Sequence, residues 1–347
     1  MRHTLAPHDT VAMVSPAVGG GDLEKIMRPM WTSFSKAASA FFILLAAPAF
    51  AEEPIVKAAG SFVTFQEDVA NLEKSPIKTG KQLDAALDRM AAHSPQSLSK
   101  GYISFGALNA AQSPGFNASL QKIRKSYGDD RLFSGLKTDM NYASRLPGSG
   151  EAVQAALNTA LVEGAKASTV GEQFEQRAYS LQKTPMKAEK APKGAVRVAQ
   201  LKAAQEKGRP VSSTFLAAMN APAAGESQTE QGSRLLQQIS QALKIGPSSA
   251  YASSTSLTGG LKYKAQNRDT IDRMVTLAAY QELDPSSKLA SEQETVMLDP
   301  KTKDCLEWSK LQLNQCVAAS RFKYEHAFCL GRHALKDVGA CMKNPVQ

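Results

Sequence analysis

The chain has 347 residues, a formal net charge of +9 at pH 7, 43% hydrophobic residues, 21% charged residues and four cysteines. This composition excludes a fully disordered chain, and the sparse cysteines exclude a small scaffold held by disulfides throughout. The length is sufficient for one large domain or two smaller ones.

The beginning of the chain has the pattern of a secretory signal peptide. A basic residue precedes the apolar run AASAFFILLAA, and Ala49 and Ala51 follow it as a small-x-small cleavage site. The run is too short to span a bilayer as a helix. We therefore expect cleavage after Ala51, no transmembrane span in the mature chain and a periplasmic or secreted location; an uncleaved anchor is the alternative. Residues 1–26 do not fit a signal peptide, which favours a start at Met27 or Met30.

Helical periodicity dominates residues 52–181, where the charges are balanced. Thr79 precedes an apolar stripe of helical spacing, and Ser94 and Ser113 each precede a proline, as is typical of helix starts. A longer stretch, 153–181, predicts either one long helix or two helices joined at a glycine. The Ser-Pro pairs recur every 19 residues, so stacked helical hairpins are the alternative to irregular packing.

Most of the positive charge lies in one segment. The mature chain carries +8, of which +6 falls within residues 182–210. The start of this segment, QKTPMKAEKAPKG, is poor in apolar residues, so we interpret 182–260 as a basic, flexible linker with short helices at Val196–Glu206 and Ser233–Lys244. The alternative is electrostatic binding to an anionic envelope surface, and the lack of interleaved aromatic residues disfavours nucleic acid. The predicted basic surface consists of Lys183, Lys187, Lys190, Lys193, Arg197, Lys202, Lys207 and Arg209.

The four cysteines lie near the end of the chain, in two predicted helices joined by a turn. Cys305 and Cys316 would be about 16 Å apart along one helix, too far for a disulfide. Facing residues of an antiparallel hairpin have a constant sum of residue numbers, which selects the pairs Cys305–Cys341 and Cys316–Cys329 over the crossed pairing. Cys329 and Cys341 lie about 120° apart around an ideal helix. We expect Gly339 to end the helix and let Cys341 reach its partner.

Residues 261–347 offer few groups for chemistry. A metal site at His326, Cys329 and His333 is the alternative use of one thiol, but no C-x2-C pair accompanies it, so we expect no metal and no cofactor. No nucleophile elbow, phosphate loop, H-E-x-x-H or dinucleotide motif is present, and we assign no catalytic residues. We expect Trp308 to pack between the two cysteine-bearing helices.

Two resemblances concern the architecture. The segment CLEWSKLQLNQC…AFCLGRHALKDVGAC resembles disulfide-stapled helical hairpins of the coiled-coil-helix kind, whose cysteine gaps are shorter, so the resemblance implies a hairpin and nothing more. The mature chain is also similar to uncharacterised exported α-helical proteins of alphaproteobacteria. That resemblance implies no activity.

These features together predict an all-α fold. It is an irregular helical bundle or a set of helical hairpins, with helical regions at 52–181 and 261–347 and a disulfide-stapled hairpin at the end. We expect a non-enzymatic exported envelope protein that binds another protein or an anionic envelope surface. The alternative is a cell-wall-acting enzyme that uses carboxylates not identified in the sequence, and a pair of buried acids in a cleft of residues 55–181 would favour it.

Overall fold

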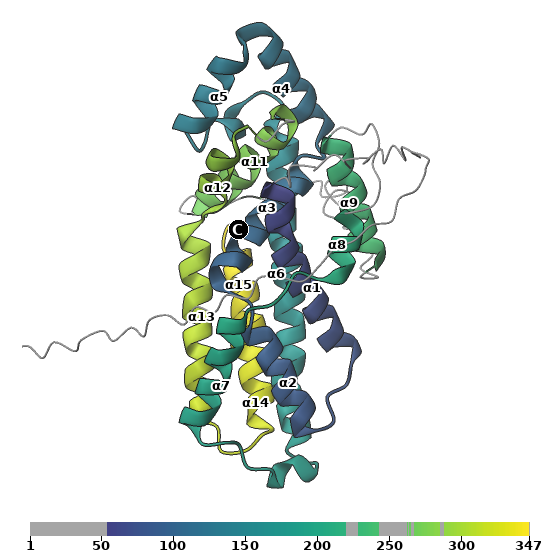
Figure 1. Ribbon diagram of the computed structural model, residues 1–347, viewed down its shortest axis with the longest axis vertical. Helices are drawn as coiled ribbons and strands as arrows, with labels where there is room; N and C mark the ends of the chain where they lie inside the picture. The colour runs from purple at the N-terminus through teal and green to yellow at the C-terminus, as the bar shows by residue number, and fades with distance from the viewer. Residues whose placement is uncertain are drawn as a thin grey trace, which may run out of the picture. The chain divides into compact units, whose positions relative to one another are not determined.

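The computed structural model describes residues 54–219, 228–242, 262, 264, 267–284 and 288–346. The expected signal peptide with its cleavage site, and residues 243–260 of the predicted linker, lie outside these residues. In the described part of the chain the regular elements are helices, which confirms the all-α class (Figure 1). An isolated β-bridge pairs Lys190 with Phe322. No helix in this part is both long enough and apolar enough to cross a membrane.

Local capping signals begin the second and third helices. Thr79 Oγ1 accepts a hydrogen bond from Gln82 N (3.2 Å), and Gln82 Oε1 accepts one from Thr79 N (3.1 Å), which completes a capping box. Ser94 accepts a hydrogen bond from Ser97 N, as expected for a serine before a proline. Ser113 also precedes a proline but makes no side-chain cap. The first five helices are α1 (Pro54–Lys74), α2 (Gly80–Ala91), α3 (Pro95–Ala110), α4 (Pro114–Tyr127) and α5 (Asp129–Thr138).

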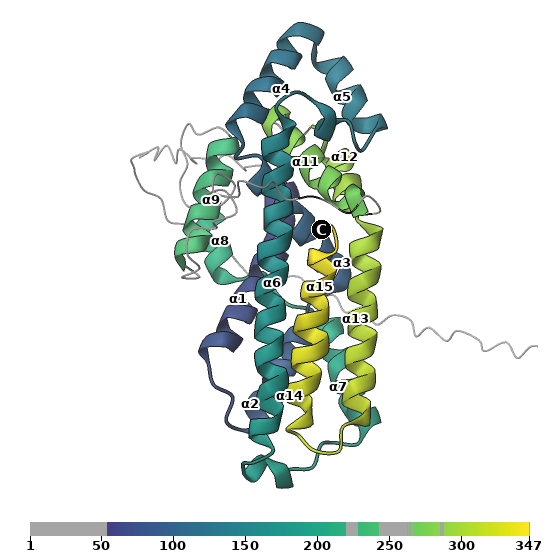
Figure 2. The same cartoon turned by 180° about the vertical axis from the view of Figure 1, so that it is seen from behind.

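A long helix and the C-terminal hairpin lie side by side. After the short helix η1 (Ala143–Arg145), α6 (Ser149–Leu181) runs as a single helix through both of its glycines, which resolves the choice between one helix and two. The hairpin pairs α13 (Pro300–Ala319) with a second helix that returns beside α6 (Figure 2). This return helix consists of α14 (Glu325–Cys329), the π-helix η4 (Leu330–Lys336) and α15 (Asp337–Lys343).

The early and late helices share one hydrophobic core. The central α3 packs against α1, α6, α13 and α11 (Arg268–Leu283), which precedes α12 (Ala290–Met297). Its fully buried Tyr102 donates a hydrogen bond to the carbonyl of Met342 in the return helix (2.8 Å). Residues 54–181 and 267–346 are therefore packed together and are not separate folding regions.

Residues 182–219 belong to this bundle, so their interpretation as a linker is wrong. They form η2 (Pro185–Ala188), α7 (Gly194–Lys207) and α8 (Ser213–Met219). The short helix predicted at Val196–Glu206 is confirmed as the main part of α7. Helix α7 packs against α2 and α13 and buries Leu201, while α8 buries Phe215. Burial of these large apolar side chains stabilises the packing of the two short helices against the bundle. The next helix, α9 (Gln228–Ala242), begins five residues before the predicted Ser233.

Trp308 does not pack between the hairpin helices, and this expectation is wrong. Its surface is 62% exposed. The face of α13 that is buried carries Leu306, Ser309, Leu313 and Val317, which recur at helical spacing. Trp308 lies outside that stripe and therefore faces solvent.

Glycines bring α6 and the return helix into backbone contact. A Cβ added to Gly164 would lie 2.6 Å from the carbonyl oxygen of Gly339, and one added to Gly171 would lie 2.6 Å from that of Gly331. Gly331 and Gly339 in turn have no space for a Cβ against Gly171 and Gly164. We call these two pairs the glycine contacts. Gly339 lies within α15, so the expectation that it ends the helix is wrong.

Replacing Gly171 by alanine is expected to lower the free energy of unfolding by about 2 kcal/mol, since the new methyl group meets backbone atoms that cannot rotate away. Gly150, in the same helix, is the matched control because a Cβ there would meet no atom within 4 Å. Gly150→Ala is expected to raise the stability by up to about 1 kcal/mol through its helix propensity. Urea denaturation of both variants measures the difference, and equal effects would contradict the close contact.

Candidate functional site

Two nested disulfides close the hairpin. Cys305 is bonded to Cys341 and Cys316 to Cys329, each with a Cα–Cα distance of 5.7 Å. This is the pairing that the hairpin register predicts. Cys329 is therefore not available as a metal ligand, and no group of three His, Cys, Asp or Glu side chains in the described residues is arranged to hold a metal ion.

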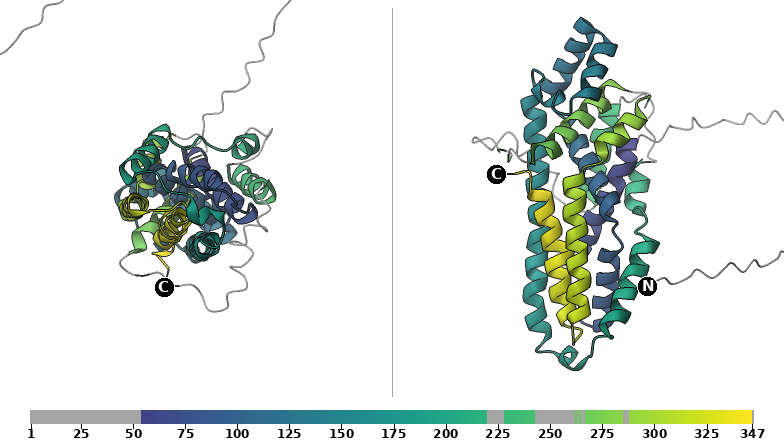
Figure 3. Two further views of the ribbon diagram at one scale, coloured as in Figure 1. Left: turned by 90° about the horizontal axis from the view of Figure 1, so that it is seen from below. Right: turned by 90° about the vertical axis from the view of Figure 1, so that its left-hand side faces the viewer.

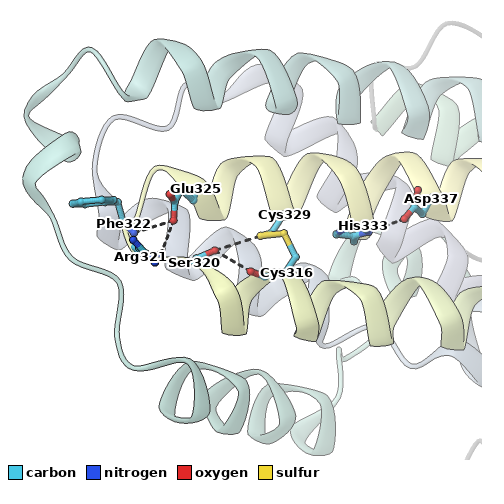
Figure 4. The surroundings of a disulfide bond; sticks show 8 residues. All are labelled: Cys316, Ser320, Arg321, Phe322, Glu325, Cys329, His333 and Asp337. Atoms are coloured by element: carbon cyan, nitrogen blue, oxygen red, sulfur yellow. Dashed lines mark hydrogen bonds and ion pairs between the residues drawn. A yellow bond between two sulfur atoms is a disulfide. The ribbon is translucent and has the colours of Figure 1, made fainter.

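The turn of the hairpin is held by local hydrogen bonds (Figure 4). The Glu325 carboxylate accepts hydrogen bonds from the backbone N–H groups of Arg321 and Phe322, the second at 3.1 Å. Ser320 Oγ donates to the Cys316 carbonyl (3.0 Å) and lies 3.6 Å from Cys329 Sγ. The carboxylate and the inner disulfide thus hold the turn from its two sides.

The same turn is joined to the segment that follows α6. Lys190 and Phe322 form an antiparallel bridge, and Lys323 N donates to the Glu189 carbonyl (3.0 Å). The Lys190 ammonium lies 4.1 Å from the centre of the Phe322 ring, a cation–π contact. The start of α2 is also close, since a Cβ on Gly80 would contact the side chains of Glu189 and Lys323.

Three segments distant in the sequence therefore gather exposed cations at one end of the bundle, which we call the basic end. The left-hand view in Figure 3 looks onto this end from below. Its acidic side chains are Asp84 and Glu325, which are bound by neighbouring donors, and the exposed Glu189. The exposed cations of the basic end are Lys78, Lys81, Lys183, Lys187, Lys190, Lys193 and Arg321.

The predicted basic surface is correct for part of its residues only. Lys183, Lys187, Lys190 and Lys193 are exposed at the basic end, and Lys202 and Lys207 are exposed along α7. Arg197 is a correction, because it is buried with only 1% of its surface exposed. Arg209 is partly exposed, but its guanidinium binds a buried carboxylate and is therefore not fully available to a partner.

Arg197 is buried because α2 supplies acceptors for its guanidinium. Nη1 donates to Asp88 Oδ1 (2.7 Å) and Nη2 to the Asp84 carbonyl (3.2 Å). Asp84 also accepts hydrogen bonds from Lys323 Nζ (2.6 Å) and lies 3.3 Å from His326 Nδ1. Burial raises the pKa of Asp84, but the hydrogen bonds from His326 and Lys323 and the charge of Arg197 outweigh it and lower this pKa to about 2.

Because the pKa of Asp84 is lowered in the folded chain, we expect the protein to lose stability in acid. The pKa of Asp84 is lower in the folded chain than the usual value near 3.9, so its contribution of about 2 kcal/mol is complete above pH 5 and is lost as the pH falls from about 4 to 2. We expect Asp84→Asn to flatten the pH dependence of unfolding in this range. Asp130→Asn, in the exposed first turn of α5, is the control. Urea midpoints measured from pH 6 to pH 2 test this, and parallel curves for wild type and Asp84→Asn would contradict it.

A fully buried carboxylate, Asp68, joins α1 to the end of α2. It binds Arg209 through two hydrogen bonds (2.8 and 2.9 Å) and His93 Nε2 through one (2.9 Å). Burial raises the pKa of Asp68, but the hydrogen bonds and charges of His93 and Arg209 outweigh it and lower the pKa. The ion pair fixes the end of α7 against α1.

A small, partly open cavity of about 30 Å³ lies between α1, the end of α2, α3, α13 and the return helix. His93 and His333 line it together with Lys310, whose pKa is lowered by burial against the opposing charge of Glu307. His333 Nδ1 bonds to the carboxylate of Asp337 (2.7 Å). The remaining lining is mostly apolar, so this cavity holds basic groups without an acid among them.

A larger groove lies between α6 and the hairpin, beside the inner disulfide. Its volume is about 400 Å³, and two of its aromatic side chains are unusually open to solvent, Tyr179 at 64% and Phe328 at 38%. We call it the aromatic groove. Its lining consists of Ala178, Tyr179, Gln182, Cys316, Ala319, Ser320, Tyr324, Glu325, Phe328 and Cys329.

Neither of these two cavities is lined by a pair of carboxylates, as the alternative of a carboxylate-based enzyme requires. His326, which the metal alternative used, contacts Asp84, while His333 contacts Asp337.

Comparison with known proteins adds no family. No protein-family model matches the chain, and no curated protein or solved structure is similar to it at the level at which relationship is inferred.

Tyr179 and Phe328 are the site residues that sequence reasoning missed. Phe328 lies within the apolar run AFCLG, and Tyr179 lies beside the apolar positions Ala178 and Leu181, where an aromatic residue is typical of a core position. Each is one position away from a buried residue, Ala178 and Cys329 respectively. Only the packing of α6 against the return helix determines that these two rings face outward.

Proposed function

We propose that this chain is an exported, non-enzymatic protein that binds an anionic partner through its basic end. The observation that carries the proposal is the gathering of exposed lysines from 78–81 and 183–193 with Arg321 on one surface. Clustered charge of one sign raises the local concentration of oppositely charged partners and speeds their encounter. The two disulfides support export, since such bonds persist in oxidising compartments.

Charge reversal tests the proposal directly. A triple variant, Lys183→Glu with Lys187→Glu and Lys193→Glu, changes exposed residues of the basic end. Retention of the purified mature protein on cell-envelope fractions is expected to fall about tenfold or more in this variant, and retention of the wild type is expected to fall as salt is added.

The matched control reverses three exposed lysines outside the basic end, Lys125, Lys202 and Lys207. Both triple variants have the same net charge, so a difference between them reports position. Equal retention of wild type and the basic-end variant would overturn the proposal. Equal loss in both triple variants would also overturn it, because net charge alone would then explain the retention.

A further inference from the structure

The aromatic groove is open on one side and has a defined floor. Cys329 and Ala178 are buried at its base, while Tyr179 on α6 and Phe328 on the return helix stand at its rim. A volume of about 400 Å³ falls within the range of pockets that bind small molecules or single side chains. Aromatic residues at the rim of such a pocket are the usual anchors of protein interfaces.

The surroundings of the groove are cationic. Its lining residues Gln182 and Ser320 are followed directly by Lys183 and Arg321, both exposed at the basic end. The one carboxylate in the lining, Glu325, accepts hydrogen bonds from two backbone N–H groups of the turn. This carboxylate is therefore held within the turn, and a ligand meets apolar rings beside cations that have open faces.

We propose that the aromatic groove binds an acidic peptide segment of a partner protein and receives one large apolar side chain of that segment between Tyr179 and Phe328. This inference rests on the proposed function of the basic end and names the partner class. Carboxylates of the segment pair with Lys183 and Arg321 while the apolar side chain is buried. The anchor gives the contact its specificity, and the cations orient the segment.

A peptide fits this surface better than a bilayer does. Binding to an anionic bilayer requires apolar side chains that protrude from a face and enter the headgroup region. Here the base of the groove, at Ala178 and Cys329, is buried between two helices, and the exposed rings of Tyr179 and Phe328 stand on either side of it. A single side chain reaches such a recess, whereas a lipid surface does not.

The test is selection of a displayed library of random short peptides against the oxidised mature protein. Peptides that are enriched are expected to combine a large apolar residue with aspartate or glutamate. Their binding to the double variant Tyr179→Ser, Phe328→Ser is expected to be weaker by about tenfold or more. The matched control is Trp308→Ser, which removes an aromatic residue of similar exposure on α13 outside the groove and is expected to leave binding unchanged.

Two further measurements separate this inference from the proposed function. Circular dichroism establishes that the double variant is folded, as expected for changes at exposed rings. Binding of wild type and the double variant to vesicles with and without anionic phosphatidylglycerol serves as the lipid probe. Vesicle binding that is lost in the double variant would show that the groove contacts lipid and would overturn the inference. Enriched peptides that bind the double variant as well as wild type would overturn the inference, as would an absence of enriched peptides. If the basic-end variant loses envelope retention while the enriched peptides bind the double variant as well as wild type, the proposed function stands and the inference about the groove fails.

Discussion

Replacing Cys305 and Cys341 together by alanine is expected to lower the free energy of unfolding by about 4 kcal/mol. The reason is the length of chain that the bond closes, 36 residues in sequence separation, which the disulfide restricts in the unfolded state. The outer bond also joins the start of α13 to α15, whose Met342 accepts the buried hydrogen bond of Tyr102. Denaturant unfolding of the oxidised protein and the double variant measures the loss.

The inner bond is the control for loop length. Cys316→Ala with Cys329→Ala removes a loop closure of only 13 residues, worth about 3 kcal/mol alone and less while the outer bond closes the same segment. The expected order is therefore a larger loss for the outer pair. A larger loss for the inner pair would show that strain or packing, and not loop closure, governs the contribution of these bonds.

Substitution of Asp68 is expected to have the second-largest effect. Asp68→Ala leaves His93 buried without its partner and releases Arg209 from two hydrogen bonds, which is expected to lower the free energy of unfolding by about 3 kcal/mol. The effect depends on burial, since no part of the Asp68 side chain is exposed. Thermal and urea unfolding at pH 7 provide the measurement.

An exposed residue on the same helix provides the comparison for Asp68. Asn71→Ala, one turn further along α1, is expected to change stability by less than about 0.5 kcal/mol. Asp68→Asn separates charge from shape, because it keeps the volume and loses the ion pairs. If Asp68→Asn were as stable as wild type, the ion pair with Arg209 would contribute nothing, and the assigned role of this carboxylate would be wrong.

The cysteine pairing was predictable from residue numbers, but the geometry that permits it was not. Twelve residues separate Cys329 from Cys341, which on an ideal α-helix points them to different faces. The chain solves this with η4, a π-helix at Leu330–Lys336, rather than with a helix end at Gly339. A π-turn accommodates one extra residue, so the twelve-residue step acts as one of eleven and matches the step from Cys305 to Cys316. Periodicity in the sequence gives no signal for a single widened turn.

The interpretation of residues 182–219 as a linker was wrong for a different reason. The composition of this segment is that of a linker, and four of its lysines are indeed exposed at the basic end. Arg197 and Arg209, however, bind Asp88 and Asp68, which lie more than a hundred residues earlier. The sequence around a charged residue does not show which distant residue it will pair with. Buried and exposed cations therefore cannot be distinguished until the packing of the helices is known. The exposure of Tyr179 and Phe328 in the aromatic groove likewise depends on the packing of two helices that are distant in the sequence.

The glycine contacts between α6 and the return helix determine how far apart the walls of the aromatic groove stand. Tyr179 lies eight residues beyond Gly171 on one wall, and Phe328 lies three residues before Gly331 on the other. A methyl group at Gly171 would push the two helices apart and change the width of the groove without altering any residue that lines it. The ligand preference of this surface is thus set partly by residues that no ligand can touch, and selection for binding would act on those glycines as well as on the groove itself.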